Sequence, residues 1–141
     1  MTLKYIDPNN LHEVWDYVKN GLEHILRKAP DKWRVEDVFH HIKAANFYLH
    51  TIQDKQGENT GFVVLQVVQG WAGKEMHVFA AYSLDPAIMD YAFDEVKELA
   101  KRMGVNYLKF TSSRKGWDKR AEQLGYKFEN VTYEIDLTKT P

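Results

Sequence analysis

The sequence contains no cysteine, which excludes disulfide frameworks, thiolate zinc sites and cysteine nucleophiles. It also has no excess of either charge, because 19 Lys and Arg residues stand against 20 Asp and Glu residues. The net charge of −1 gives no overall field that would draw the chain to nucleic acid or to an anionic membrane. The function classes that depend on thiols or on a strongly basic surface are therefore set aside.

Long apolar segments are missing as well. The longest apolar run, residues 62–68, is interrupted by Gln66 and is far too short to cross a bilayer. The opening stretch, MTLKYIDPNN, lacks the apolar core of a signal peptide. We therefore expect a cytoplasmic protein, or one that is assembled inside a cell.

Repeats, linkers and low-complexity tracts are absent from the 141 residues. A chain of this length can bury most of its apolar surface without the help of disulfide bonds. The sequence therefore predicts one domain over residues 1–141.

Two amphipathic helical patterns occupy the first part of the chain. Residues 2–7 suit a short strand, after which Asn9 or Asn10 can cap a helix, because an Asn side chain accepts hydrogen bonds from first-turn amides. Pro30 ends this helix, and Asp31 is expected to cap a second one. Three-and-four spacing marks the buried stripe of the first helix at Leu11, Val14, Trp15, Val18, Leu22, Ile25 and Leu26, and that of the second at Val35, Val38, Phe39 and Ile42.

Strand-forming sequence dominates after residue 46. We expect strands over residues 47–53, 61–69, 75–83, 105–111 and 131–137, a long helix over 86–103, and a short helix that carries Trp117, Ala121 and Leu124 and ends at Gly125. The strand–helix–strand unit over 75–111 should join parallel neighbours. The predicted order, β-α-α-β-β-β-α-β-α-β, gives an α/β fold of three layers, with a mixed central sheet between helices.

This order, together with the ending RAEQLGYKFENVTYEIDL and its Leu124-Gly125-Tyr126 turn, resembles the GNAT superfamily of N-acetyltransferases. The stretch FTSSRKGWDKRAEQLGYKF is similar to small GNAT-like proteins of phages and prophages. The second helix of those proteins has a counterpart in the segment Glu36-Asp37-Val38-Phe39. The resemblance implies the fold predicted above and, if the chain is active, acyl transfer from acetyl-CoA to an amine.

By resemblance, acetyl-CoA would lie between two parallel strands that splay apart, here residues 75–83 and 105–111. The pantetheine arm would pair with the backbone of Phe79, Ala80, Ala81, Tyr82 and Ser83. Backbone amides at Ala87, Ile88 and Met89 would face the pyrophosphate at the helix start.

The turn at this helix start departs from the family pattern, which is rich in glycine. Residues 84–89 contain no glycine, and Asp85 places a carboxylate where the diphosphate would arrive. Pro86 removes one amide donor. An N-cap followed by proline at the first helical position is an ordinary helix start. We therefore interpret this turn as a helix cap at the position where the family has a phosphate-binding turn.

The family's general acid is missing too. Many GNAT enzymes place a tyrosine four residues before the glycine of the Leu-Gly-aromatic turn, and that position is Ala121 here. Tyr82 or Tyr91 can substitute only if the hydroxyl lies near the thiol. Aromatic packing is the plainer explanation for both tyrosines.

The candidates for a general base are Glu75 and His77. Strand alternation places His77 on the face of Phe79 and Ala81, opposite Met76, Val78 and Ala80. If this face borders the cleft, either side chain can deprotonate an amine, although a buried, hydrogen-bonded histidine is the commoner outcome. Metal binding is not expected, because adjacent histidines such as His40 and His41 point about 100° apart on a helix.

Basic residues gather after the fifth predicted strand, at Lys109, Arg114, Lys115, Lys119 and Arg120. They can meet an anionic partner, but nucleic acid would need a broader basic footprint with stacking aromatics. Two functions therefore stay open. The first is an acyl-CoA-dependent N-acyltransferase that acts on a small-molecule or protein amine. The second is a catalytically silent GNAT-fold protein, such as a phage accessory or virion-associated component, that contacts a phage or host protein.

Overall fold

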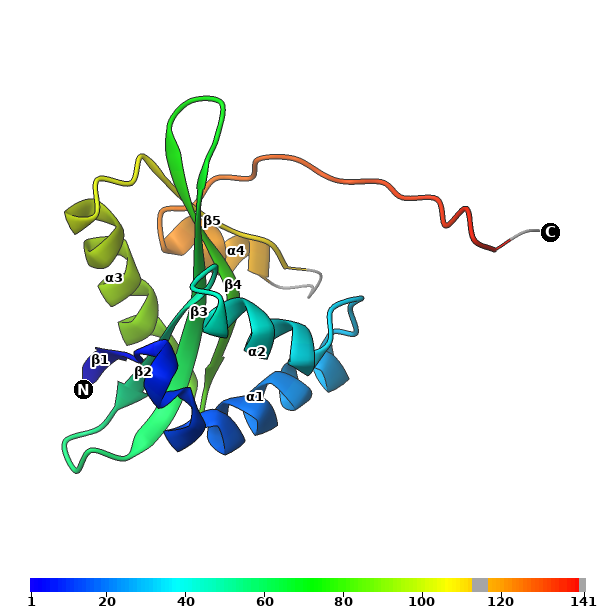
Figure 1. Cartoon of the computed structure of the whole chain (residues 1–141). Helices are drawn as coiled ribbons and strands as arrows, with labels where there is room; N and C mark the ends of the chain where they lie inside the picture. Colours follow the sequence, from blue (N-terminus) through cyan, green and yellow to red (C-terminus); the bar gives the residue numbers. More distant parts are fainter. Residues whose placement is uncertain (113–116, 140–141) are drawn as a thin grey trace. The chain divides into compact units, whose positions relative to one another are not determined.

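The computed structural model describes residues 1–112 and 117–139 (Figure 1). The chain divides into two compact units, Met1–Thr111 and Ser112–Pro141, and each is considered by itself. The prediction of a single domain over the whole chain stays a prediction.

A mixed sheet forms the centre of the first unit. Among the described residues it has five strands in the order β1-β2-β3-β4-β5. Neighbours from β1 to β4 are antiparallel, and β5 runs parallel to β4. The elements of this unit are β1 (Thr2–Tyr5), the 3₁₀ helix η1 (Pro8–Glu13), α1 (Trp15–Lys28), α2 (Val35–Lys43), β2 (Tyr48–Gln53), β3 (Asn59–Gln69), β4 (Lys74–Ser83), α3 (Pro86–Arg102) and β5 (Tyr107–Phe110).

Helices cover both faces of this sheet, with α1 and α2 on one side and α3 on the other (Figure 1). The α1/α2 face buries the predicted helical stripes against β2, β3 and β4, and its core includes Val18, Leu22, Val38, Ile42, Leu49, Phe62, Val64 and Ala80. The buried residues of α3 are Ile88, Ala92, Phe93, Val96 and Ala100. The three-layer α/β arrangement predicted from the sequence is thus present in the first unit.

Both N-terminal helices begin at other residues than predicted. Asp7, rather than Asn9 or Asn10, is the first cap, and its carboxylate accepts from the Asn9 amide at 2.8 Å. The cap opens a 3₁₀ helix, and the α-helix begins only at Trp15. The second helix begins at Val35 rather than beside Asp31, because Asp37 accepts from the Arg34 amide at 2.8 Å and closes the first turn there.

The prediction of a last strand over residues 131–137 was wrong. In the second unit the described residues form α4 (Trp117–Gln123), and no strand follows it there. The alternation of Val131, Tyr133, Ile135 and Leu137 favours a strand, but strands are stabilised by pairing with a neighbour. The element order therefore ends at α4 instead of β.

Candidate functional site

The pairing between β4 and β5 stops part of the way along β4. The parallel ladder joins Glu75 to Tyr107 and ends where Val78 meets Phe110, while β4 continues to Ser83. Within the described residues, the last five positions of β4 have no strand partner on the side of β5. These positions are the predicted cofactor-binding residues Phe79, Ala80, Ala81, Tyr82 and Ser83. Their backbone forms an open sheet edge, a surface that an extended polar ligand can join by hydrogen bonds.

A β-bulge occurs where this open edge begins. Val64 of β3 pairs with Ala80, but the next residue, Leu65, pairs with Val78, so Phe79 is the extra residue. The bulge breaks the alternation that was predicted along β4. Ala80 belongs to the core on the α1/α2 face, and Phe79 packs against that same core. His77 and Phe79 therefore share a face as predicted. The prediction was wrong for Ala80 and also for Ala81, which lies between Ala80 and Tyr82 and faces the opposite side, because a bulge reverses the alternation that follows it.

The two predicted base candidates contact each other on β4. His77 Nε2 lies 3.0 Å from Glu75 Oε1, and Lys109 Nζ of β5 lies 3.0 Å from Glu75 Oε2. The His77 hydrogen bond and then the Lys109 hydrogen bond lower the pKa of Glu75. An ionised carboxylate only accepts hydrogen bonds, so in this contact His77 donates through Nε2. The three side chains form a carboxylate–imidazole pair supported by an ammonium group.

Aromatic side chains surround Phe79 at the bulge. The Phe79 ring lies 4.7 Å from Phe47 and 5.2 Å from Trp33, measured between ring centroids. Trp33 belongs to the segment between α1 and α2. This segment therefore lies against the start of the open edge.

Tyr82, the third catalytic candidate, packs on α1. Its ring centroid is 5.7 Å from that of Phe62, 5.6 Å from His24 and 6.4 Å from Tyr17. Burial, and then the neighbouring Tyr82, raise the pKa of Tyr17 to about 12. The Tyr17 hydroxyl is thus protonated at neutral pH, and it is enclosed without a hydrogen-bond partner.

The start of α3 is closed by the side chain of Asp85. Its Oδ1 accepts from the Ile88 amide at 3.0 Å, and the Met89 amide donates to the Asp85 carbonyl at 3.3 Å. Ser83 Oγ donates to the same carbonyl at 2.8 Å. Of the three amides predicted to face a pyrophosphate, those of Ile88 and Met89 therefore bond to Asp85, while Ala87 lies exposed in the first turn. The sequence prediction of a cap followed by Pro86 describes this helix start correctly.

The other candidates lie elsewhere. Tyr91 donates its hydroxyl to the Met1 carbonyl at 2.7 Å, and Ala121 is a half-buried residue of α4 in the second unit. Arg114 and Lys115 fall outside the described residues. No cluster of three metal-ligating side chains occurs within residues 1–112 and 117–139. In the same part of the chain, every helix is too short or too polar to span a membrane.

Sequence reasoning missed the role of Lys109 and the aromatic neighbours Trp33, Tyr17 and His24. Lys109 was visible only as one member of a basic cluster. Its contact with Glu75 depends on the register of β5 against β4, which pairs Lys109 with His77.

Comparison with protein-family models gives no match, and comparison with curated proteins gives none either. Solved structures do match. A probable acetyltransferase shares 12% identity and a TM-score of 0.72 over 96% of this chain and 99% of its own. A ribosomal-protein-alanine N-acetyltransferase from Brucella melitensis biovar Abortus 2308 shares 15% identity and a TM-score of 0.73 over 97% of this chain and 100% of its own.

An aminoglycoside acetyltransferase from an uncultured soil metagenomic sample, in complex with sisomicin, is similar as well. It shares 10% identity and a TM-score of 0.70 over 96% of this chain and 95% of its own. At such identities the likeness establishes the fold alone. The protein has an α/β, GNAT-like fold, with a mixed five-stranded sheet in its described residues.

Proposed function

We propose that the protein is an acyl-CoA-dependent N-acyltransferase. The observation that carries the proposal is the open edge of β4, which begins where the β4–β5 ladder ends at Val78 and Phe110. The amides of a pantetheine arm can pair with backbone groups along residues 79–83 as a strand would, and such pairing needs no particular side chain. This is why the edge fits acetyl-CoA even though the side chains around it depart from the family pattern.

Acetyl-CoA supplies an acetyl thioester whose carbonyl carbon can be attacked by an amine, with a thiolate as the leaving group. His77 is the proposed base that takes the proton from the attacking nitrogen. In the neutral imidazole that donates Nε2–H to Glu75, Nδ1 carries the lone pair that accepts this proton. Glu75 is a positioning residue that holds the imidazole in this tautomer, while Lys109 keeps the carboxylate ionised. Tyr82, on the open stretch of β4, is the proposed donor of a proton to the departing thiolate.

The diphosphate fits less well than the pantetheine. Asp85 engages the Ile88 amide and carries a negative charge at the helix start. Two unit charges about 4 Å apart repel by about 4 kcal/mol at an effective dielectric of 20. Asp85 is exposed, so screening reduces this repulsion to about 1–2 kcal/mol. We propose a degenerate phosphate turn that weakens the binding of acetyl-CoA without preventing it.

The first test fills the open edge. Saturating acetyl-CoA, at about a hundred times its Kd, is expected to stabilise the wild-type protein by about 2.7 kcal/mol. Ala81→Trp should abolish this thermal shift, together with release of free thiol from acetyl-CoA in the presence of a panel of primary amines. Ala72→Trp makes the same change at an exposed hairpin position and should keep both. A wild-type protein unaffected by millimolar acetyl-CoA, or an Ala81→Trp variant that still binds it, would contradict the proposal.

The second test concerns charge at the helix start. Asp85→Asn keeps an oxygen that can accept from the Ile88 amide but removes the negative charge. The affinity for acetyl-CoA should rise about tenfold, which corresponds to about 1.4 kcal/mol, as measured by isothermal titration. Asp94→Asn removes the same charge farther along α3, more than about one Debye length away, where the interaction is largely screened, so it should change the affinity much less. Equal affinities in the wild type and Asp85→Asn would mean that the phosphates do not approach this turn.

A second candidate function is a catalytically silent GNAT-fold protein that acts through contacts with another protein. The cap formed by Asp85 favours this alternative, because it occupies the amide of Ile88 in the place of a phosphate. Its expected result is no response to acetyl-CoA or CoA in the titrations above. The link to phage and prophage proteins stays a prediction from the sequence.

A further inference from the structure

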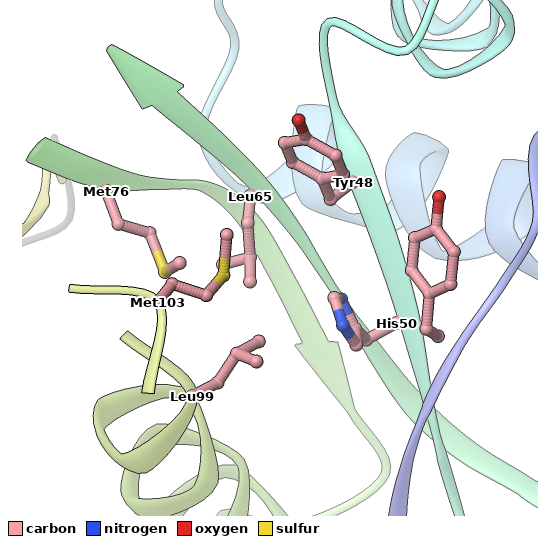
Figure 2. Close-up of a pocket in the computed structure, with 7 residues that line it drawn as sticks. Tyr48, His50, Leu65, Met76, Leu99 and Met103 are labelled. Atoms are coloured by element: carbon pink, nitrogen blue, oxygen red, sulfur yellow. The ribbon is translucent and has the colours of Figure 1, made fainter. Parts of the chain in front are cut away.

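A pocket lies on the α3 face of the sheet (Figure 2), and none of its lining residues belongs to the open edge of β4. Its volume is about 280 Å³, and its lining comes from four strands and the C-terminal end of α3. The lining residues are Tyr5, Tyr48, His50, Leu65, Met76, Leu99 and Met103. An apolar cavity of about 150 Å³ can hold one benzene ring, so this pocket has room for a single or a fused pair of rings.

The floor of the pocket is buried and its mouth is open to solvent. Leu65 and Met76 are almost fully buried at 1% exposure each. Tyr5 is 49% exposed and Met103 is 39% exposed, so these two side chains leave a route from solvent. A small molecule can therefore enter without unfolding of the sheet or of α3.

His50 is the polar group of this pocket. It is only 8% exposed, its Nδ1 is enclosed without a hydrogen-bond partner, and its ring reaches from β2 toward Leu65 and Leu99 (Figure 2). A buried polar group with no partner is costly, and a bound molecule that supplied the partner would remove that cost. His50 therefore distinguishes this pocket from a simple gap in apolar packing.

The lining contains no Lys, Arg, Asp or Glu, and burial lowers the pKa of His50 to about 4. The imidazole is thus neutral at physiological pH and offers no charge to a carboxylate or phosphate. The sulfur atoms of Met76 and Met103 and the rings of Tyr5 and Tyr48 make favourable contacts with aromatic rings.

We propose that this pocket binds a small, uncharged aromatic molecule with one hydrogen-bonding group, of the size of a phenol or an indole. The ring lies among Leu65, Met76, Leu99 and Met103, and its hydroxyl or N–H bonds to His50 after a small adjustment of the enclosing side chains. This site is independent of the proposed acyltransferase cleft. Failure of one proposal leaves the other untouched.

The test is a titration with indole and phenol, followed through the methyl signals of Met76 and Met103 in NMR spectra. We expect saturable shifts at these methyl groups, with dissociation constants on the order of 0.1–1 mM for ligands of so few atoms. Toluene, which lacks the polar group, should bind at least about fivefold more weakly, and benzoate should not bind. Absence of saturable shifts with both probes, shifts confined to other methyl groups, or equal binding of toluene or benzoate would overturn the proposal.

Two variants make the test specific. Leu99→Trp should fill the pocket and abolish the shifts, whereas Lys97→Trp places the same residue at an exposed position of α3 and should bind indole like the wild type. His50→Phe should bring phenol down to the affinity of toluene, which keeps the proposal falsifiable if Leu99→Trp does not fold. Indole binding unchanged in both Leu99→Trp and His50→Phe would place the ligand elsewhere. An acetyl-CoA titration of Leu99→Trp and His50→Phe tests the proposed acyltransferase cleft separately, so that failure of the pocket and failure of the cleft can be told apart.

Discussion

Gly21→Val is expected to lower the free energy of unfolding by about 3 kcal/mol, at the upper end of the usual cost of overpacking a core. A Cβ atom at Gly21 would lie 2.9 Å from Phe62 Cζ, nearer still to Phe62 Cε2, and 3.1 Å from Tyr82 Cδ2. Phe62 is fully buried, so its ring cannot swing aside. Helix propensity offers little relief, because glycine and valine differ by only about 0.4 kcal/mol in a helix interior. The clash therefore determines the outcome.

Chemical denaturation measures this effect, and Asn20→Val is the matched control. Asn20 is the exposed neighbour of Gly21 on α1, and its replacement should change the free energy of unfolding by less than about 0.5 kcal/mol. Equal stabilities of the two variants would mean that α1 does not pack against β3 and β4 as described. Because the added side chain also presses on Tyr82, Gly21→Val should weaken any response to acetyl-CoA.

The sequence predicted the elements that have a strong local signature. The stripes of α1 and α2 follow three-and-four spacing, and Pro30 and Pro86 mark a helix end and a helix start. Asp85 was identified as a cap because aspartate followed by proline is a typical N-terminus. The parallel pairing of β4 with β5 followed from the intervening helix.

Features that depend on strand register could not be predicted from the sequence. Nothing in the pattern of β4 reveals that Phe79 is an extra residue, because bulges are defined by the pairing with the neighbouring strand. The contact of Lys109 with Glu75 needs the same knowledge of register. The role of Gly21 also depends on the fold, because the missing side chain lets α1 approach Phe62 and Tyr82 closely.

His50 shows a further limit. Its sequence context, YLHTIQ, reads as an ordinary strand, and no motif separates it from the other five histidines. Its burial follows from the position of β2 between β1 and β3, with α3 on the same face. The polar group of the proposed aromatic pocket was therefore invisible before the fold was known.

The other large effect expected is a loss of stability in mild acid caused by His50. Burial lowers its pKa from 6.5 to about 4. Between these values the unfolded chain binds a proton at His50 that the folded protein does not bind. The free energy of unfolding therefore falls as the pH falls, by up to about 1.4 kcal/mol per pH unit. Relative to neutral and higher pH, the free energy of unfolding is lower by about 0.4 kcal/mol at pH 6.5, by about 2 kcal/mol near pH 5, and by about 3 kcal/mol near pH 4.

Urea denaturation between about pH 6.5 and pH 5 isolates this effect, because carboxylates with a lowered pKa, such as Glu75 and Asp37, matter mainly below their ordinary values of 4.5 and 3.8. His50→Phe keeps an aromatic ring beside Tyr5 but cannot be protonated, so its stability should change little with pH in this range. Thr51→Val alters the adjacent buried residue of β2 without removing a titrating group, and it should keep the wild-type slope. A His50→Phe variant with the same slope as the wild type would show that the imidazole is not buried on the α3 face. The pocket proposed above would then lose its polar group as well.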